Sequence, residues 1–176
     1  MTIDSIEDQV DQTSPPVRFH HGLYEVFLPV TDIPRAIDFY VGKLGFELGY
    51  QKGDVIALLM YTDKKTRWML GLSKVDTAPQ HKGADWHHIS FRVAEQDVDQ
   101  MMSFLSDSGI ETVHPSGAPV KGPMTEPIVH GWMPAAAVFF KDPDGHLLEL
   151  IADLSDAPRP EVLYQPLSEW RAFVPE

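Results

Sequence analysis

The stretch EVFLPVTDIPRAIDFYVGKLGFELG, residues 25–49, decides the fold, because it predicts a strand, a helix and a second strand in that order. The first strand is apolar from Leu23 to Val30, except that Glu25 lies inside it. Burying an ionised carboxylate is costly unless a cation or hydrogen-bond donors compensate. Glu25 therefore needs a partner from elsewhere in the chain.

The helix that follows this strand is expected to have one buried face. Asp32 is a suitable N-cap, Pro34 fits the first turn, and Gly45 stands at the end. The apolar and aromatic side chains of one helical face are Ile33, Ala36, Ile37, Tyr40 and Leu44. This pattern is typical of a helix that packs on a sheet.

Further strands follow, and the same order of elements then recurs in the second half of the chain. The first unit adds strands over residues 46–51, 54–62 and 67–74. The second unit has a strand over 86–93, a helix over 96–109, and strands over 110–113, 135–141 and 146–153. A spacing of 63 residues separates both Glu25 from His88 and Val30 from Val93. The sequence therefore predicts an α+β fold of two repeated βαβββ modules, over about residues 20–74 and 86–154.

The remaining segments are interpreted by composition. Residues 1–17 are polar and acidic and end in TSPP, which predicts a mobile N-terminal arm. Residues 114–134 are rich in Pro and Gly and are expected to form a long loop that covers a site. The tail, residues 155–176, is expected to pack on the domain or on a second subunit. The rest of the chain, residues 18–154, is expected to form a single domain.

Charge and composition exclude several functions. Asp and Glu outnumber Lys and Arg by 26 to 14, giving a net charge of −12, so nucleic acid and anionic membranes are poor partners. The chain has no cysteine, which excludes disulfides, thiolate ligands and a cysteine nucleophile. Because neither an export signal nor a membrane-length apolar run is present, we expect a cytoplasmic protein.

Three polar residues fall on matching faces of the repeated strands. Side chains alternate across a strand, so Glu25, His88 and Glu149 each lie opposite an apolar face that is expected to pack under a helix. The strand faces that carry these three polar residues would together line one concave site. Two carboxylates and one imidazole neutralise a divalent cation and leave positions open for substrate, which favours a catalytic metal site. Candidate ions are Mn²⁺, Fe²⁺, Ni²⁺, Zn²⁺ and Mg²⁺.

Each of the three residues also has a structural interpretation. Glu25 can pair with Arg18 or Arg67, or lie at an exposed strand edge. His88 alone is more often a hydrogen-bonded core histidine, and Glu149 can be a solvated hairpin residue. The joint pattern favours the metal over these alternatives.

The stretches EVFLPVTDIPRAIDFYVGKLGFELG, HHISFRV and FFKDPDGHLLELI together resemble the vicinal oxygen chelate superfamily, which contains glyoxalase I, bleomycin-resistance proteins, fosfomycin-resistance enzymes and extradiol dioxygenases. The resemblance covers about residues 20–154, and DPDGHLLEL is its most specific part. It implies paired βαβββ modules that form an open, barrel-like mixed sheet with helices outside. It also implies a homodimer, with the metal held by Glu25, His88 and Glu149 from one chain or from two.

The sequence also departs from the named activities. The first ligand is commonly His or Gln, whereas here it is Glu25. The fourth ligand of glyoxalase I would fall on Gly71, or on Leu70 after a one-residue slip, and neither side chain binds a metal. The tyrosine of extradiol dioxygenases is replaced by Phe139, and the small hydroxyl residue of fosfomycin enzymes by Phe27.

The resemblance implies a metal-dependent lyase or isomerase of glyoxalase type, whose small substrate chelates the metal through adjacent oxygens. Glu149 or Glu25 is the candidate base. Candidate substrate contacts are Tyr61, Arg67, His130 and Trp132. The alternatives are a metal-dependent ring-cleaving dioxygenase and a metal-free protein that binds a small molecule, as bleomycin-resistance proteins do.

Overall fold

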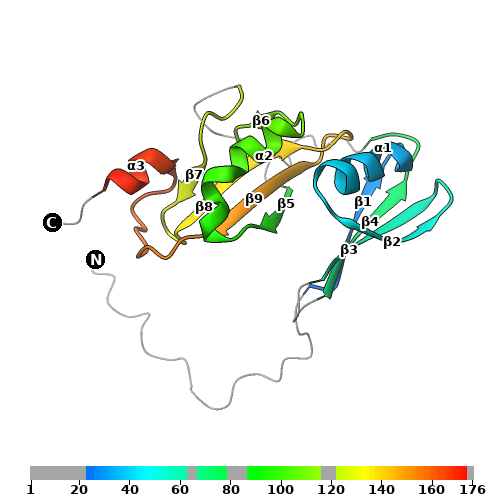
Figure 1. The fold of residues 1–176 in the computed structure, drawn as a ribbon, viewed down its shortest axis with the longest axis horizontal. Helices are drawn as coiled ribbons and strands as arrows, with labels where there is room; N and C mark the ends of the chain where they lie inside the picture. The colour runs from blue at the N-terminus through cyan, green and yellow to red at the C-terminus, as the bar shows by residue number, and fades with distance from the viewer. Residues whose placement is uncertain (1–22, 63–66, 79–86, 116–121, 174–176) are drawn as a thin grey trace, which may run out of the picture.

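The computed structural model describes residues 23–62, 67–78, 87–115 and 122–173, which form two mixed sheets arranged side by side (Figure 1). The arm expected over residues 1–17 lies outside the described residues. In the described part, no helix is long and apolar enough to cross a membrane.

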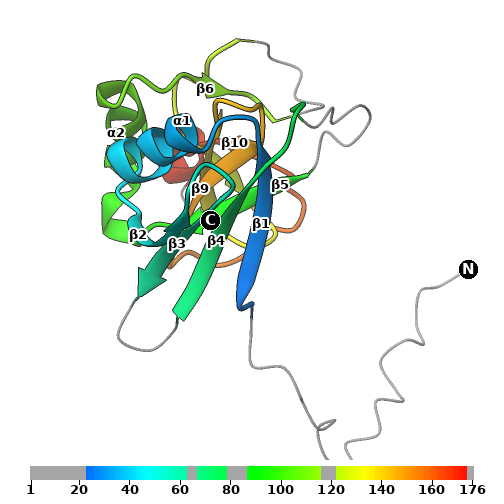
Figure 2. The ribbon, with the colours of Figure 1, turned by 90° about the vertical axis from the view of Figure 1, so that its right-hand side faces the viewer.

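The first module forms a four-stranded sheet. Its elements are β1 (Glu25–Val30), α1 (Ile33–Ile37), the π-helix η1 (Asp38–Lys43), β2 (Glu47–Lys52), β3 (Ile56–Thr62) and β4 (Arg67–Lys74). The strand order is β1-β4-β3-β2, with β1 parallel to β4 and the other pairs antiparallel. Figure 2 shows β1, β4 and β3 next to one another, with β1 at the edge of the sheet.

The second module repeats this topology and adds strands. Its elements are β5 (His88–Arg92), the 3₁₀ helix η2 (Glu95–Gln100), α2 (Met101–Asp107), β6 (Thr112–Val113), β7 (Ile128–His130), β8 (Ala135–Lys141), β9 (Leu147–Asp153), β10 (Gln165–Pro166) and α3 (Leu167–Ala172). The strand order is β10-β7-β8-β9-β5, and β6 also pairs with β8. Because β5 runs parallel to β9 as β1 does to β4, the predicted repeat of modules and the α+β class are confirmed.

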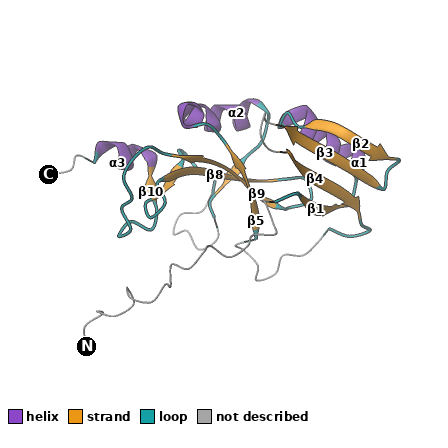
Figure 3. Ribbon diagram, turned by 90° about the horizontal axis from the view of Figure 1, so that it is seen from below, coloured by secondary structure: helices purple, strands orange, loops and turns teal. Residues whose placement is uncertain are grey.

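The two module helices lie on the same side of the sheets, as Figure 3 shows for α1 and α2. The Asp32 side chain accepts a hydrogen bond from Arg35 N at 2.9 Å, as expected of the N-cap. Gly45, with φ of 77°, ends this helical segment in a conformation that glycine adopts at little cost. The opposite faces of the two sheets carry none of the described helices, and we call them the open faces.

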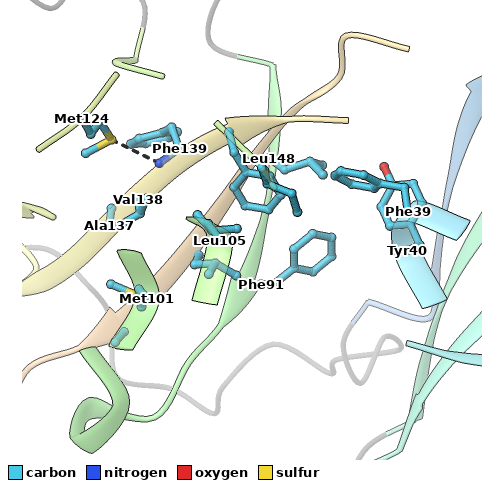
Figure 4. Packing of buried hydrophobic residues seen from close by; sticks show 14 of the residues in the cluster. Phe39, Tyr40, Phe91, Met101, Leu105, Met124, Ala137, Val138, Phe139 and Leu148 are labelled. Atoms are coloured by element: carbon cyan, nitrogen blue, oxygen red, sulfur yellow. Dashed lines mark hydrogen bonds between the residues drawn. The ribbon is translucent and has the colours of Figure 1, made fainter. Parts of the chain in front are cut away.

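Aromatic side chains from both modules share one core between the sheets. Phe39 lies 6.5 Å from Phe140, and Phe46 lies 5.1 Å from Phe91, measured between ring centroids. Figure 4 shows Phe39 of the first module pointing toward Leu148 of the second module. The modules therefore pack against each other through buried apolar surface, which is the main favourable term in folding.

The DPDG turn between β8 and β9 also joins the modules by hydrogen bonds. The Asp144 carboxylate accepts from Thr31 N at 2.9 Å, Thr31 Oγ1 at 2.6 Å and Arg35 Nη2 at 2.9 Å. His146 is buried, with Nε2 2.7 Å from Pro29 O. The segment most characteristic of the sequence resemblance thus holds the start of α1 to the second module.

Replacing Tyr40 by Phe should destabilise the protein by about 1–3 kcal/mol, because it leaves a buried acceptor without its donor. Tyr40 is fully buried, and its hydroxyl donates to Asp142 Oδ2 at 2.9 Å. Urea denaturation would measure the change in the free energy of unfolding. Tyr50→Phe is the matched control, since Tyr50 is half exposed, and an equal effect of both changes would contradict this role.

The segment between β6 and β8 differs from its prediction. Residues 114–134 were expected to form a loop throughout, but β7 lies within them and pairs with β8. The many Pro and Gly residues of this segment indicate a loop. The strand β7 is only three residues long, and its pairing depends on residues far away in the sequence. In the tail, β10 pairs with β7 of the same chain.

Candidate metal centre

The second sheet places three site residues next to one another on its open face. Strand register puts Ser90 of β5 opposite Glu149 of β9, and Glu149 opposite Phe139 of β8. His88 shares this face, because it precedes Ser90 by two residues in β5. The alternate residues Leu148 and Leu150 of β9 belong to the core. The sequence-based assignment of faces for β5 and β9 is thus confirmed.

Glu149 is the centre of this group and is only 2% exposed. Ser90 Oγ donates a hydrogen bond to Glu149 Oε2, and His88 Nε2 lies 3.2 Å from the same oxygen. His130 Nε2 lies 3.8 Å from the other oxygen, Oε1, which is an ion-pair distance and longer than a hydrogen bond. The His88 ring meets the Phe139 ring edge-on at 5.6 Å.

These neighbours determine the charge of Glu149. Burial alone raises the pKa of a carboxyl group, but His130, His88 and Ser90 all favour the ionised form and outweigh it. The pKa of Glu149 is lowered from 4.5 to about 2. At neutral pH this carboxylate is therefore ionised and able to act as a metal ligand.

Ionised Glu149 should stabilise the metal-free protein, and this contribution should depend on pH. Since its folded-state pKa lies below its unfolded value of 4.5, the contribution is complete above that value and is lost as pH falls toward about 2. The expected loss between pH 6 and pH 3 is on the order of 2 kcal/mol. Urea denaturation at several pH values, with chelator present, measures it.

Glu149→Gln should remove this part of the pH dependence, whereas Glu47→Gln, on the exposed strand β2, should leave it in place. The same pH dependence in wild type and Glu149→Gln would show that Glu149 does not make this contribution.

Glu25 lies in the other sheet. It is exposed on β1, at the edge of the sheet, so in the single chain it matches the alternative of an exposed strand edge rather than a buried carboxylate. On the same face, the Phe27 ring covers Gly71 of β4, where an added Cβ would lie 2.4 Å from the ring. Phe27 thus takes up the space that a ligand side chain at position 71 would need.

Within the described residues, no group of three or more His, Asp or Glu side chains is arranged to hold a metal ion. The structure brings together His88 and Glu149, two of the three predicted ligands, and leaves Glu25 on the open face of the first sheet. It adds His130, which was expected to contact substrate. Trp132 is 56% exposed, and the side chains of Tyr61 and Arg67 lie outside the described part.

Ser90 is the site residue that sequence reasoning did not identify. Its signal was present, because Ser90 follows His88 by two residues and therefore lies on the same face of the strand. A single serine on such a face has no specific meaning until the parallel pairing of β5 with β9 places it opposite Glu149.

Comparison with solved structures identifies proteins of similar fold. An integron cassette protein from the mobile metagenome of the Halifax Harbour sewage outfall is 28% identical, with a TM-score of 0.58 over 76% of this chain and 99% of that one. Lactoylglutathione lyase from Agrobacterium tumefaciens is 17% identical, with a TM-score of 0.53 over 77% and 96%. A variant of the fosfomycin resistance protein of Listeria monocytogenes, solved with Mn(II) and 1S,2S-dihydroxypropylphosphonic acid, is 20% identical, with a TM-score of 0.55 over 77% and 93%.

Comparison with curated proteins gave no match. The family described as the Glyoxalase/Bleomycin resistance protein/Dioxygenase superfamily matches residues 18–150, which include both modules and the three predicted ligands. Lactoylglutathione lyase and the fosfomycin resistance proteins share the paired-module fold. The chain therefore belongs to the glyoxalase/bleomycin resistance protein/dioxygenase superfamily, which is the vicinal oxygen chelate superfamily that its sequence resembles.

Proposed function

We propose that this protein is a divalent-metal-dependent enzyme of glyoxalase type, a lyase or isomerase, that acts on a small substrate with two adjacent oxygen atoms. The observation that carries this proposal is the buried, ionised carboxylate of Glu149 with His88 Nε2 3.2 Å away. A buried carboxylate with a strongly shifted pKa beside a specific partner is typical of a functional site.

The donor set fits a divalent cation. Imidazole nitrogen and carboxylate oxygen are ligands that Mn²⁺, Fe²⁺, Ni²⁺ and Zn²⁺ accept, and carboxylates alone suit Mg²⁺. With Glu25 as the third ligand, two carboxylates and a neutral imidazole balance the charge of the ion. The Mn(II) bound to the fosfomycin resistance protein of similar fold supports this assignment.

The third ligand is contributed by a second copy of the chain. Glu25 and the pair of His88 and Glu149 lie on the open faces of two different sheets, and Glu25 is exposed in the single chain. A homodimer in which the first module of one copy faces the second module of the other would bring the three groups together. The family resemblance, which implies a homodimer with ligands from one chain or from two, is compatible with this sharing.

The side chains of the site would have separate roles in the reaction. When bound, the metal would act as a Lewis acid toward the two substrate oxygens. Glu149 is kept ionised and in a fixed orientation by its neighbours Ser90, His88 and His130. A carboxylate with a pKa of about 2 accepts protons poorly at neutral pH. The low pKa of Glu149 therefore favours Glu25, the other candidate, as the base.

Metal analysis of reconstituted protein tests the proposal. The protein should be loaded separately with Mn²⁺, Fe²⁺, Ni²⁺, Zn²⁺ and Mg²⁺ and then freed of excess ion. About one equivalent per chain is expected for at least one of them. No binding of any of these ions would contradict a metal-dependent enzyme and favour a protein that binds a small molecule without metal.

Mixing two inactive variants tests whether the site is shared. At a metal concentration that just fills the wild-type sites, Glu25→Ala and His88→Ala should each hold almost no metal, because each lacks one ligand. If the site is shared, random pairing of the two variants should restore about a quarter of the wild-type metal content, since half of the dimers have one complete site. If all ligands came from one chain, mixing would restore nothing.

A further inference from the structure

The C-terminal extension, which we define as residues 155–173, lies beyond residue 150, where the family match ends. It forms β10 and α3 and packs along β7, seen at the orange and red end of the chain in Figure 1. Strand register places Gln165 opposite Val129 and Pro166 opposite Ile128. Without β10, β7 would be a three-residue edge strand, and such strands fray readily.

The extension contacts the β7 segment on both sides of His130. Before His130, Ser168 N and Oγ donate to the Glu126 carboxylate at 2.8 and 3.0 Å, and Leu167 N donates to Pro127 O at 2.9 Å. After His130, Arg159 N donates to Gly131 O at 2.8 Å. The backbone on either side of this histidine is therefore fixed by residues outside the family match.

The contact at Gly131 is too close for any other residue. A Cβ at this position would lie 2.6 Å from Val162 O and 2.7 Å from Arg159 O. Both atoms belong to the backbone of the extension, so a side chain at position 131 would push the extension away from β7. A glycine is thus required for this close approach.

The extension is held in shape by its own side chains. The Arg159 guanidinium lies 3.4 Å from the ring centroid of Trp170 and 4.3 Å from that of Phe173, which are cation–π distances. Trp170 is 4% exposed, and its Nε1 donates to Asp156 at 3.0 Å. None of these residues contacts Glu149 in the described structure, so the extension reaches the site through β7.

We propose that the C-terminal extension is a functional part of the site, because it positions His130 against Glu149. Ser90 and His88 engage Glu149 Oε2, and His130 Nε2 faces the remaining oxygen, Oε1, at 3.8 Å. Residues that orient a metal-binding carboxylate contribute to metal affinity without touching the ion. The inference rests on the proposed function, in which Glu149 holds the metal.

Two variants of the extension contact test this role. Gly131→Ala forces the extension from β7, and Arg159→Ala removes its internal stacking without changing β7. Each should weaken Mn²⁺ binding, measured by calorimetry, by about 10-fold or more. Arg171→Ala is the control, because Arg171 is in α3 but pairs with Asp99 of η2, and it should bind Mn²⁺ as wild type does.

The double variants identify the route of the effect. In a His130→Ala background, Gly131→Ala and Arg159→Ala should cause no further loss of Mn²⁺ affinity, because residues that act through one partner are not additive. A merely structural extension would weaken binding equally with or without His130, and that result would overturn the proposal. Wild-type affinity in folded Arg159→Ala would overturn it as well.

A second measurement separates this proposal from the proposed function. If wild-type protein binds no divalent ion, the metal-dependent function fails, and the positioning role is then judged by the NMR signal of the His130 ring in metal-free protein at fixed pH. Arg159→Ala should shift this signal and Arg171→Ala should not. An unchanged signal in Arg159→Ala overturns the positioning role.

Discussion

Replacing His88 by alanine should reduce the affinity for a divalent cation by more than about 100-fold, since even residues outside the ligand set commonly account for about 10–100-fold. His88 is the one imidazole within 3.2 Å of the Glu149 carboxylate in the described structure. Its loss removes a proposed ligand and also a group that lowers the pKa of Glu149. Calorimetric titration of metal-free protein with Mn²⁺ would measure the change, with Glu149→Gln expected to have an effect of similar size.

His87→Ala is the matched control. His87 is the neighbouring residue, is exposed, and belongs to the opposite face by the alternation of the strand. It should bind Mn²⁺ within about twofold of wild type, because an exposed side chain on the opposite face contributes little to the site. Equal losses in His87→Ala and His88→Ala would contradict the assignment of faces on which the metal centre depends.

The repeated modules were predictable because local patterns determine them. The Asp32 cap, the apolar face of the first helix and the alternation in β5 and β9 are each encoded within a few residues. The spacing of 63 residues between Glu25 and His88 indicates the repeat from the sequence alone. Elements whose boundaries are set locally were therefore predicted to within one or a few residues.

The contacts of Glu149 were less predictable because distant strands make them. His130 reaches the carboxylate only after β7 pairs with β8, and β7 lies in a segment where Pro and Gly indicate a loop. Ser90 reaches it through the parallel pairing of β5 with β9, between residues 59 apart in the sequence. Pairings of this range are not encoded in any short window of sequence.

The position of Glu25 illustrates the same limit at a larger scale. Alternation correctly placed it on the face opposite Val26, Leu28 and Val30. Which open face it meets depends on how whole sheets are arranged, and in one chain Glu25 and Glu149 belong to different sheets. The sequence can therefore indicate which residues are ligands without indicating that these residues lie close together. The mixing experiment tests whether they lie close together in a dimer.

Replacing Phe140 by alanine should destabilise the protein by about 3–5 kcal/mol, the usual cost of emptying a buried aromatic site. Phe140 is fully buried on β8, and its ring lies 6.5 Å from Phe39 of the first module. The cavity would open where the two modules share their core, so the loss is a large part of the roughly 5–15 kcal/mol that stabilises a typical domain. Urea denaturation followed by tryptophan fluorescence would measure it.

The expected effect extends to the candidate metal centre, because β8 carries Phe140 on its core face and Phe139 beside His88 on the open face. Phe140→Leu fills most of the cavity and should cost markedly less than Phe140→Ala. Phe104→Ala, on the partly exposed face of α2, should cost less than about 1 kcal/mol. An equal loss in the free energy of unfolding for Phe140→Ala and Phe104→Ala would show that the modules do not depend on a shared core. The packing of the modules would then not explain the position of β8 and its open-face residues.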